Sequence, residues 1–255
     1  MTTQIDLNSD LGESYGPWTM GDDATMLSIV TSANVACGGH ASDPETMYKT
    51  LTLARDNGVT VGAHPGYNDP LGFGRRVIPM SNEAITRMVA AQIGALQGMA
   101  RLVNVPVAYV KPHGALANVA ARDPDVAKAV LKAIQGVAPD AAILAISGTA
   151  LEVAAKAAGA QVYSEIFADR GYLSSGQLVP RGQDGAMIHD AAQAAQRLLQ
   201  MLNTGLMPVI DGDPIALDAH SICVHGDGPA AVAMAGEIRA RLTAAGVAIA
   251  PFVGG

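Results

Sequence analysis

Ionisable side chains recur directly after the segments that are predicted to be β-strands. Four of the six histidines follow such segments, together with carboxylates, a lysine and an arginine. The set comprises Asp10, Glu13, His40, His64, Lys111, His113, Asp169, Arg170, His225 and Asp227. Imidazoles and carboxylates in one place can act as general acids and bases or hold a metal ion. Because the carboxyl ends of the strands in a parallel barrel meet on one side, we expect these groups to converge.

The opening stretch, residues 5–14, alternates strictly between apolar and polar side chains, which is typical of a strand. Its apolar face holds Ile5, Leu7 and Leu11, and its polar face holds Asp6, Asn8 and Asp10. A solvated edge strand is one interpretation of this pattern. Crowded carboxylates, however, repel one another and shift each other's pKa values, so the polar face favours a binding site.

Two further positions carry local signals. His64 stands at the start of a loop, residues 64–76, that is dense in glycine and proline. Long ordered loops in compact domains are commonly functional. Lys111 has apolar neighbours, which predicts a buried ammonium group with an anionic partner or a lowered pKa.

Other strand-end groups have structural alternatives. His40 and His225 both adjoin glycine and could simply hydrogen-bond the backbone of a turn. The pair Arg75-Arg76 is either a solvated part of its loop or an anion clamp.

Seven strands are expected to alternate with helices along the chain. We predict them over residues 5–11, 32–37, 59–63, 107–111, 142–146, 161–166 and 221–224. Helix starts are indicated by Asp43-Pro44, Ser81, Asp123-Pro124 and Pro229, because these residues cap helices or fit their first turn. A loop-rich insertion over 173–184 precedes a helix expected from about 185 to 203.

Alternation of strands and helices predicts a parallel sheet with right-handed crossovers. An open doubly wound sheet would have fully apolar central strands, but several of these strands are half polar. A closed barrel with a polar mouth explains that composition better, and the chain is close to the usual size of such a barrel. We therefore predict an α/β fold in which residues 1–255 form a single domain, a seven-stranded (β/α) barrel.

Bulk composition limits the possible functions. Of the 255 residues, 49 % are hydrophobic and 15 % charged, and the formal net charge is −7, so a nucleic-acid partner is not expected. We recognise no signal peptide and no apolar run of about 18 residues, which predicts a cytoplasmic protein without a membrane partner. The two cysteines do not form a disulfide framework. The P-loop, the nucleophile elbow and the zinc-protease helix motif are also absent.

Several of these segments, taken together and in order, resemble the LamB/YcsF family over nearly the whole chain. The segments are 6–14, 32–40, 62–67, 72–76, 111–116 and 223–227. The family is the A component of the prokaryotic ATP-dependent 5-oxoprolinase. The resemblance implies a barrel related to the glycoside hydrolase/deacetylase group, and partner subunits B and C.

The reaction implied by the resemblance converts 5-oxo-L-proline, ATP and two waters into L-glutamate, ADP and phosphate. ATP, with magnesium on the nucleotide, would be a co-substrate, and no tightly bound organic cofactor is expected. ATP would activate the lactam oxygen as a phosphate ester, and water would then attack the activated carbon. That step needs a general base, a stabiliser of negative charge and a clamp for the substrate carboxylate.

Fitted to that chemistry, Asp10 or His64 is the expected base. Lys111 and His113 would stabilise the developing negative charge.

The remaining site residues are expected to bind the substrate. Arg170 or Arg76 would hold its carboxylate, in a bidentate manner if the geometry allows. Asp6, Asn8 and Asn34 would position water or the ring nitrogen. The other expected contacts are Glu13, His40, Asp169 and His225.

Two other functions are compatible with the sequence. One is a metal-dependent amide hydrolase or deacetylase with Asp10, His40 and His64 as ligands, because a carboxylate and two imidazoles suit zinc or a similar ion. The other is a non-catalytic scaffold that only binds partner subunits, against which the density of ionisable strand-end groups argues.

Overall fold

Residues 4–225 and 231–253 are described by the structure, a computed structural model of the chain. The expected strand-end residue Asp227 and the expected helix start at Pro229 lie outside these described residues.

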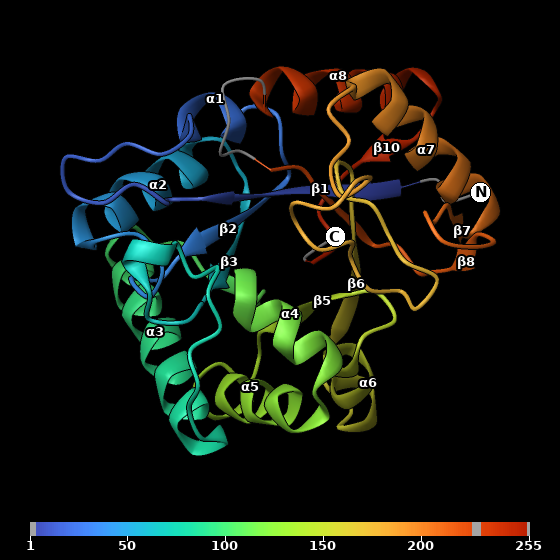
Figure 1. Cartoon of the computed structure of the whole chain (residues 1–255). Helices are drawn as coiled ribbons and strands as arrows, with labels where there is room; N and C mark the ends of the chain where they lie inside the picture. Colours follow the sequence, from blue (N-terminus) through green and yellow to red (C-terminus); the bar gives the residue numbers. More distant parts are fainter. Residues whose placement is uncertain (1–3, 226–230, 254–255) are drawn as a thin grey trace.

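Seven parallel strands close into a barrel (Figure 1). They are β1 (Gln4–Leu11), β2 (Ser32–Ala36), β3 (Thr60–His64), β4 (Val107–Val110), β5 (Ala142–Ile146), β6 (Val162–Phe167) and β9 (Ser221–Cys223). Neighbours in this order pair with one another, and the pairing of β9 with β1 closes the ring. The predicted seven-stranded (β/α) barrel is therefore confirmed.

Three short strands add to this barrel. β10 (Ala248–Ile249) pairs in parallel with the first residues of β1, beside the end of the ring where the strands begin. β7 (Leu206–Met207) and β8 (Ile215–Ala216) form a separate antiparallel pair. None of the three was predicted, since two-residue strands are too short to show a period.

Helices surround the strands in Figure 1. They are α1 (Asp23–Leu27), α2 (Pro44–Asp56), α3 (Asn82–Leu102), α4 (Gly114–Arg122), α5 (Pro124–Val137), α6 (Ala150–Ala157), α7 (Ala191–Thr204) and α8 (Ala231–Ala244), with the 3-10 turn η1 (Pro70–Gly72). The predicted caps are present, because the side chains of Asp43, Ser81 and Asp123 each accept a hydrogen bond from a backbone N–H in the first turn.

Two helix predictions need correction. α4 was not predicted, although it follows β4 directly. α7 begins at Ala191, whereas the sequence pattern placed its start near 185. Gly182 and Gly185 both have positive φ angles, of 91° and 78°, which a right-handed helix does not accommodate.

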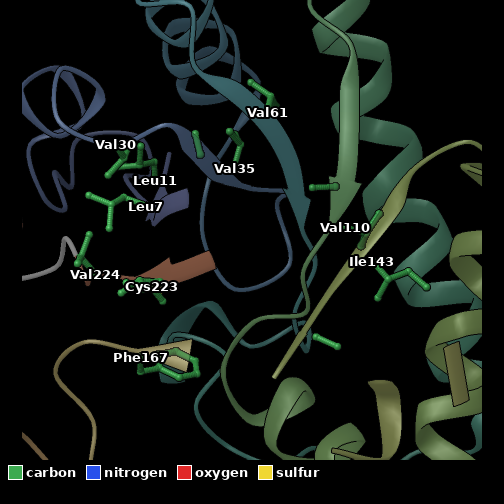
Figure 2. Packing of buried hydrophobic residues seen from close by; sticks show 14 of the residues in the cluster. Leu7, Leu11, Val30, Val35, Val61, Val110, Ile143, Phe167, Cys223 and Val224 are labelled. Atoms are coloured by element: carbon green, nitrogen blue, oxygen red, sulfur yellow. The ribbon is translucent and has the colours of Figure 1, made fainter. Parts of the chain in front are cut away.

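An apolar layer between the strands and the helices forms the main core. Figure 2 shows buried side chains from successive strands, among them Leu7, Val35, Val61, Val110 and Ile143. The helices contribute the other half of this layer from their buried stripes. Burial of this layer holds each strand against its helix and so fixes where the strand ends point.

The barrel interior, by contrast, is largely polar on the side of β1. Asp6 accepts hydrogen bonds from the hydroxyls of Thr31, Ser32 and Ser221, and Asn8 donates to Ser221 at 2.6 Å. A solvated edge strand is thereby excluded, since Asp6 is 1 % exposed.

Tyr109 fills the other side of the interior. Its ring packs against Phe252 in the C-terminal segment, with ring centroids 4.9 Å apart. Gly62 on β3 makes room for the ring, because a Cβ at that position would overlap it.

Within the described residues, none of the helices combines the length and the apolar character needed to span a membrane.

Candidate active site

A cavity of about 490 Å³ opens where the barrel strands end. Its lining includes seven of the expected site residues, namely Asp10, Glu13, His64, Lys111, His113, Arg170 and His225. The four residues predicted to be catalytic therefore share one cavity, of a volume usual for a small-molecule site.

Lys111, directly after β4, forms the centre of the cavity floor. Its Nζ lies 3.0 Å from Asp10 Oδ1 and 2.7 Å from Glu165 Oε1. It also donates to Asn8 Oδ1 at 3.2 Å. Burial alone would lower the pKa of Lys111, but Asp10, Cys223 and Glu165 raise it well above its usual range. The predicted buried ammonium group with anionic partners is present.

The two carboxylates beside Lys111 have opposite pKa shifts. Burial alone would raise the pKa of Asp10, but His64 and Lys111 hold it well below its usual range. Burial raises the pKa of Glu165, and the attraction of Lys111 offsets this only in part. Within the described residues, neither oxygen of Glu165 accepts a well-aligned hydrogen bond, despite the close ammonium group. Carboxylates whose pKa values are pushed apart can divide acid and base roles.

Three histidines gather on the neighbouring wall. The rings of His40 and His113 are stacked, with centroids 3.6 Å apart, and His64 meets His113 edge-on at 4.9 Å. His40 Nε2 lies 2.9 Å from Glu13 Oε1. Burial lowers the pKa of both His40 and His113 well below the usual histidine value, so these rings are neutral.

Gly74 allows the loop after β3 to lie against this histidine wall. A Cβ at Gly74 would stand 2.7 Å from the Cβ of His40 and 2.8 Å from Cδ2 of His113. Its φ of +62° is also one that side chains rarely adopt. The loop backbone can therefore accept a hydrogen bond from His113 Nε2 at Phe73 O, at 2.8 Å.

Possible metal ligands fall into two groups among the described residues. One consists of Glu13, His40, His64 and His113, and the other of Asp10, Cys223 and His225. The metal-hydrolase alternative has Asp10, His40 and His64 as ligands. These residues are divided between the two groups, because Asp10 lies with Cys223 of β9 and with His225. Burial raises the pKa of the Cys223 thiol well above its usual range, so it is not an activated nucleophile.

The far side of the cavity is built by β6 and the strand end after β9. His225 Nδ1 lies 2.8 Å from Asp169 Oδ2, and Arg181 Nη2 lies 3.4 Å from His225 Nε2. Burial would raise the pKa of Asp169, but His225 more than compensates and lowers it. Arg170 donates to the carbonyls of Val179 and Ala186, which fixes its guanidinium at the wall.

Five other expected contacts support the cavity from outside its described lining. Asp6, Asn8 and Asn34 lie deeper in the barrel, where Asn34 Nδ2 donates to Asp10 Oδ1 at 2.9 Å. His40 lies behind His113, and Asp169 lies behind His225. These residues position the cavity-lining side chains that they contact, namely Asp10, His113 and His225.

Arg76 is not brought to the cavity. Its guanidinium is paired with Asp69, the residue that caps the turn η1, and its side chain is 62 % exposed. The adjacent Arg75 lines the cavity instead, and its guanidinium lies over the ring of Phe73.

Several cavity residues were not predicted from the sequence. Arg122 ends α4, the helix that was not predicted, and Gln177 and Arg181 lie in the insertion over 173–184. Glu165 did carry a signal in the sequence. It follows Tyr163 by two positions in β6, so the two side chains share the inward face of the strand, while Ser164 and Ile166 lie on the other face. Gln92, on α3, was also missed: it bonds both the N–H and the C=O of Gly66 and so anchors the loop after β3.

Comparisons with known proteins agree with this geometry. A model of the LamB/YcsF family matches residues 5–254. The chain is 50 % identical over 250 residues to the third of the 5-oxoprolinase A subunits of Pseudomonas syringae pv. tomato, covering 98 % of both chains. It is also 50 % identical over 248 residues to the first of the 5-oxoprolinase A subunits of Agrobacterium fabrum, covering 97 % of both.

Solved structures show the same relationship. The lactam utilization protein from Thermus thermophilus superimposes with a TM-score of 0.91 at 40 % identity, covering 97 % of this chain and 99 % of that one. The T48 deacetylase, with a TM-score of 0.50 and 12 % identity, covers 98 % of this chain and 89 % of its own, and shares the fold alone. On this evidence the chain belongs to the LamB/YcsF family.

Proposed function

We propose that this chain is the A component of an ATP-dependent 5-oxoprolinase, a hydrolase that opens the cyclic amide of 5-oxo-L-proline to give L-glutamate. Relatives that are half identical over their full length are named as the A subunits of 5-oxoprolinases. The function is assigned to residues 1–255 as one domain. The observation that carries the chemistry is the ammonium group of Lys111 between two carboxylates at the cavity floor.

The reaction requires two waters, which the following sequence accounts for. Phosphoryl transfer from ATP to the lactam oxygen releases ADP and makes the ring carbon electrophilic. The first water adds to that carbon, the ring C–N bond breaks, and an acyl phosphate of glutamate results. The second water releases phosphate and leaves glutamate.

Residues of the cavity fit the steps of ring opening. Asp10 is ionised and 13 % exposed, so it can take a proton from the attacking water, whereas His64 is 1 % exposed. Glu165, whose pKa is raised, can donate a proton to the departing ring nitrogen. Lys111 lies between them and stabilises negative charge on the oxygen of the reacting carbon.

The substrate carboxylate would be held by a guanidinium at the cavity wall. Arg170 is the best placed, because two backbone carbonyls fix it and a guanidinium has further N–H donors to offer. The other guanidiniums of the described lining, on Arg75, Arg122 and Arg181, make the cavity suitable for an anionic substrate.

Partner subunits B and C are part of the proposal. The sequence contains no P-loop, so we assign ATP, with its magnesium, largely to those partners. Because the reaction consumes ATP, the cytoplasm is its proposed location.

The test is ATP-dependent release of glutamate from 5-oxoproline, measured for the chain alone and for the chain mixed with subunits B and C. Activity only in the mixture is the expected result. Asp10→Asn should lower kcat in the mixture by roughly 100-fold or more while the chain stays folded, as a cooperative thermal unfolding transition would show. Asp140→Asn, an exposed carboxylate before β5, is the matched control and should leave kcat unchanged.

Other outcomes distinguish the alternatives. Amide hydrolysis by the chain alone, without ATP, would favour the metal-dependent hydrolase. Full activity of the mixture with Asp10→Asn would favour the scaffold and contradict the assignment of Asp10.

A further inference from the structure

Backbone carbonyls fix the hydrogen positions on two histidines of the cavity wall. His64 Nδ1 lies 2.7 Å from Lys111 O, and His113 Nε2 lies 2.8 Å from Phe73 O. A carbonyl oxygen can only accept, so each of these ring nitrogens carries a hydrogen and donates it. The opposite nitrogens, His64 Nε2 and His113 Nδ1, are left to face the interior of the cluster.

Those two nitrogens face each other. His64 Nε2 and His113 Nδ1 are 3.0 Å apart, and the two residues are 1 % and 4 % exposed. His64 Nε2 also lies 3.3 Å from Asp10 Oδ2. Two imidazole nitrogens beside carboxylates are suited to share a positive species, either a proton or a metal ion.

A carboxylate completes the donor set at this point. Glu13 Oε1 lies 3.6 Å from His113 Nδ1. One donor atom from each of Glu13, His64 and His113, and one from His40, all fall within 4.8 Å of one another. Zinc–nitrogen bonds of about 2.0–2.1 Å place tetrahedral ligands roughly 3.3 Å apart. The separations of His113 Nδ1 from His64 Nε2, 3.0 Å, and from Glu13 Oε1, 3.6 Å, are close to that value.

We propose that Glu13, His64 and His113 bind a divalent transition-metal ion of the zinc or cobalt type. Ligating histidines usually donate their second ring N–H to a backbone carbonyl or a carboxylate, and both rings here do so. Two imidazoles and one carboxylate are a common catalytic set, which leaves an open position for water or substrate. All three residues line the cavity, so the open position is within reach of a bound molecule.

His40 acts in this site as a positioning residue. Its Nε2 donates to Glu13 Oε1 at 2.9 Å, and its ring stacks on His113. His40 Nδ1 has no hydrogen-bond partner among the described residues, which is consistent with an unprotonated nitrogen at that position. The ring therefore orients both a carboxylate ligand and an imidazole ligand.

The second group of possible ligands is less suitable. Cys223 Sγ already accepts from Lys111 Nζ at 3.3 Å, and His225 Nδ1 is engaged by Asp169. Lys111 would also place a positive charge beside any ion held there. The histidine wall is the site that the contacts favour.

Cobalt is the probe for the experiment, because its visible absorption reports ligation directly. Any bound metal is first removed from the full chain with a chelator, and the chain is then titrated with Co²⁺. Zn²⁺ is added to exchange with the bound Co²⁺, and the zinc content of the chain is measured by elemental analysis. We expect one Co²⁺ per chain, displaced by Zn²⁺. His113→Gln should weaken Co²⁺ binding at least 100-fold, whereas the exposed His189→Gln should leave it unchanged.

Neither partner subunits nor substrate enter this titration, so its result is independent of the proposed lactam chemistry. Thermal unfolding of each stripped variant shows whether it is folded, and Glu13→Gln replaces His113→Gln if the latter is not. Absence of Co²⁺ and Zn²⁺ binding to the wild-type chain would overturn the proposal in favour of a shared proton. Binding that survives substitution of Glu13 or His113 would overturn it as well.

Discussion

The two faces of β1 lie in different environments within a few ångströms of each other. Ile5, Leu7 and Leu11 belong to the apolar layer outside the barrel, where Figure 2 shows Leu7 and Leu11, whereas the alternate residues point into the barrel. Outward side chains are held by many interchangeable dispersion contacts. Inward side chains are each held by a few specific partners, such as the three hydroxyls that donate to Asp6.

This difference means that the two faces should fail in different ways. A change in the apolar layer costs free energy in proportion to the space it leaves, whatever the pH. A change in the interior costs free energy because a partner loses its hydrogen bond or its compensating charge, and titration modifies that cost.

Lys111→Met should produce the largest loss of stability. The ammonium group is the cation between Asp10 and Glu165, and its removal leaves two buried carboxylates facing each other. We expect a loss of roughly 4 kcal/mol in the free energy of unfolding, measured by urea denaturation at neutral pH. Lys128→Met, at an exposed ion pair with Asp125, should change it by less than about 0.5 kcal/mol. Equal stability of the two variants would refute this interior pairing.

Leu7→Ala tests the outward face of the same strand. Leu7 is fully buried, so the cavity left by the substitution should cost roughly 3 kcal/mol. Leu102→Ala, on a side chain that is 67 % exposed at the end of α3, is the matched control and should be nearly neutral. The loss at Leu7 should be the same at acidic and neutral pH, and a marked pH dependence would contradict the distinction between the two faces.

Asp6→Asn sharpens the comparison by removing one titrating group. Burial raises the pKa of Asp6 from 3.8 to about 6, so the folded chain holds a proton that the unfolded chain has lost. Stability from this group is fully present below pH 3.8 and is lost as the pH rises through about 6. At about 1.4 kcal/mol per pKa unit the loss is roughly 3 kcal/mol.

The measurement is urea unfolding of the wild-type chain and of Asp6→Asn between about pH 4 and about pH 7. The wild-type free energy of unfolding, relative to that of the variant, should fall over this range. A difference that stays constant or rises with pH would show that Asp6 is ionised throughout.

Tyr109→Phe should have the smallest effect. It removes the hydroxyl that donates to Asn34 Oδ1 at 2.7 Å but keeps the ring, so the buried amide oxygen loses one donor. We expect a loss of roughly 1–2 kcal/mol in thermal or urea unfolding. Tyr163→Phe is the control, because its hydroxyl accepts from the exposed Gln161, and it should change stability by less than about 0.5 kcal/mol. Similar losses in both variants would argue against a buried amide network.

Much of the barrel could be predicted because its signals are local. Period-two alternation predicted the sidedness of β1, and Asp-Pro pairs predicted the starts of α2 and α5. α4 was missed because no local signal distinguishes its residues from a loop, and the sequence pattern predicts a loop after β4. The start of α7 was misjudged because the positive φ of Gly185, which keeps this residue out of the helix, is set by the folded chain.

Convergence of the strand-end groups was predicted, but their pairing was not. Arg76 and Arg75 are adjacent in the sequence, yet only a folded loop decides that Arg75 enters the cavity while Arg76 binds Asp69. Likewise, Glu165 reaches Lys111 across the barrel interior, and no spacing along the chain encodes that distance.

By itself, the sequence determined the order of strands and helices, the inward face of β1, and the set of ionisable groups at one end of the barrel. Side-chain period and helix caps depend on neighbours a few residues away, and so they can be recognised along the chain. Only the tertiary structure decided which nitrogen of His64 faces His113, and that the pKa values of the two carboxylates near Lys111 shift in opposite directions. Hydrogen-bond direction and pKa depend on burial and on atoms from distant segments within a few ångströms, which exist as neighbours only once the barrel has closed.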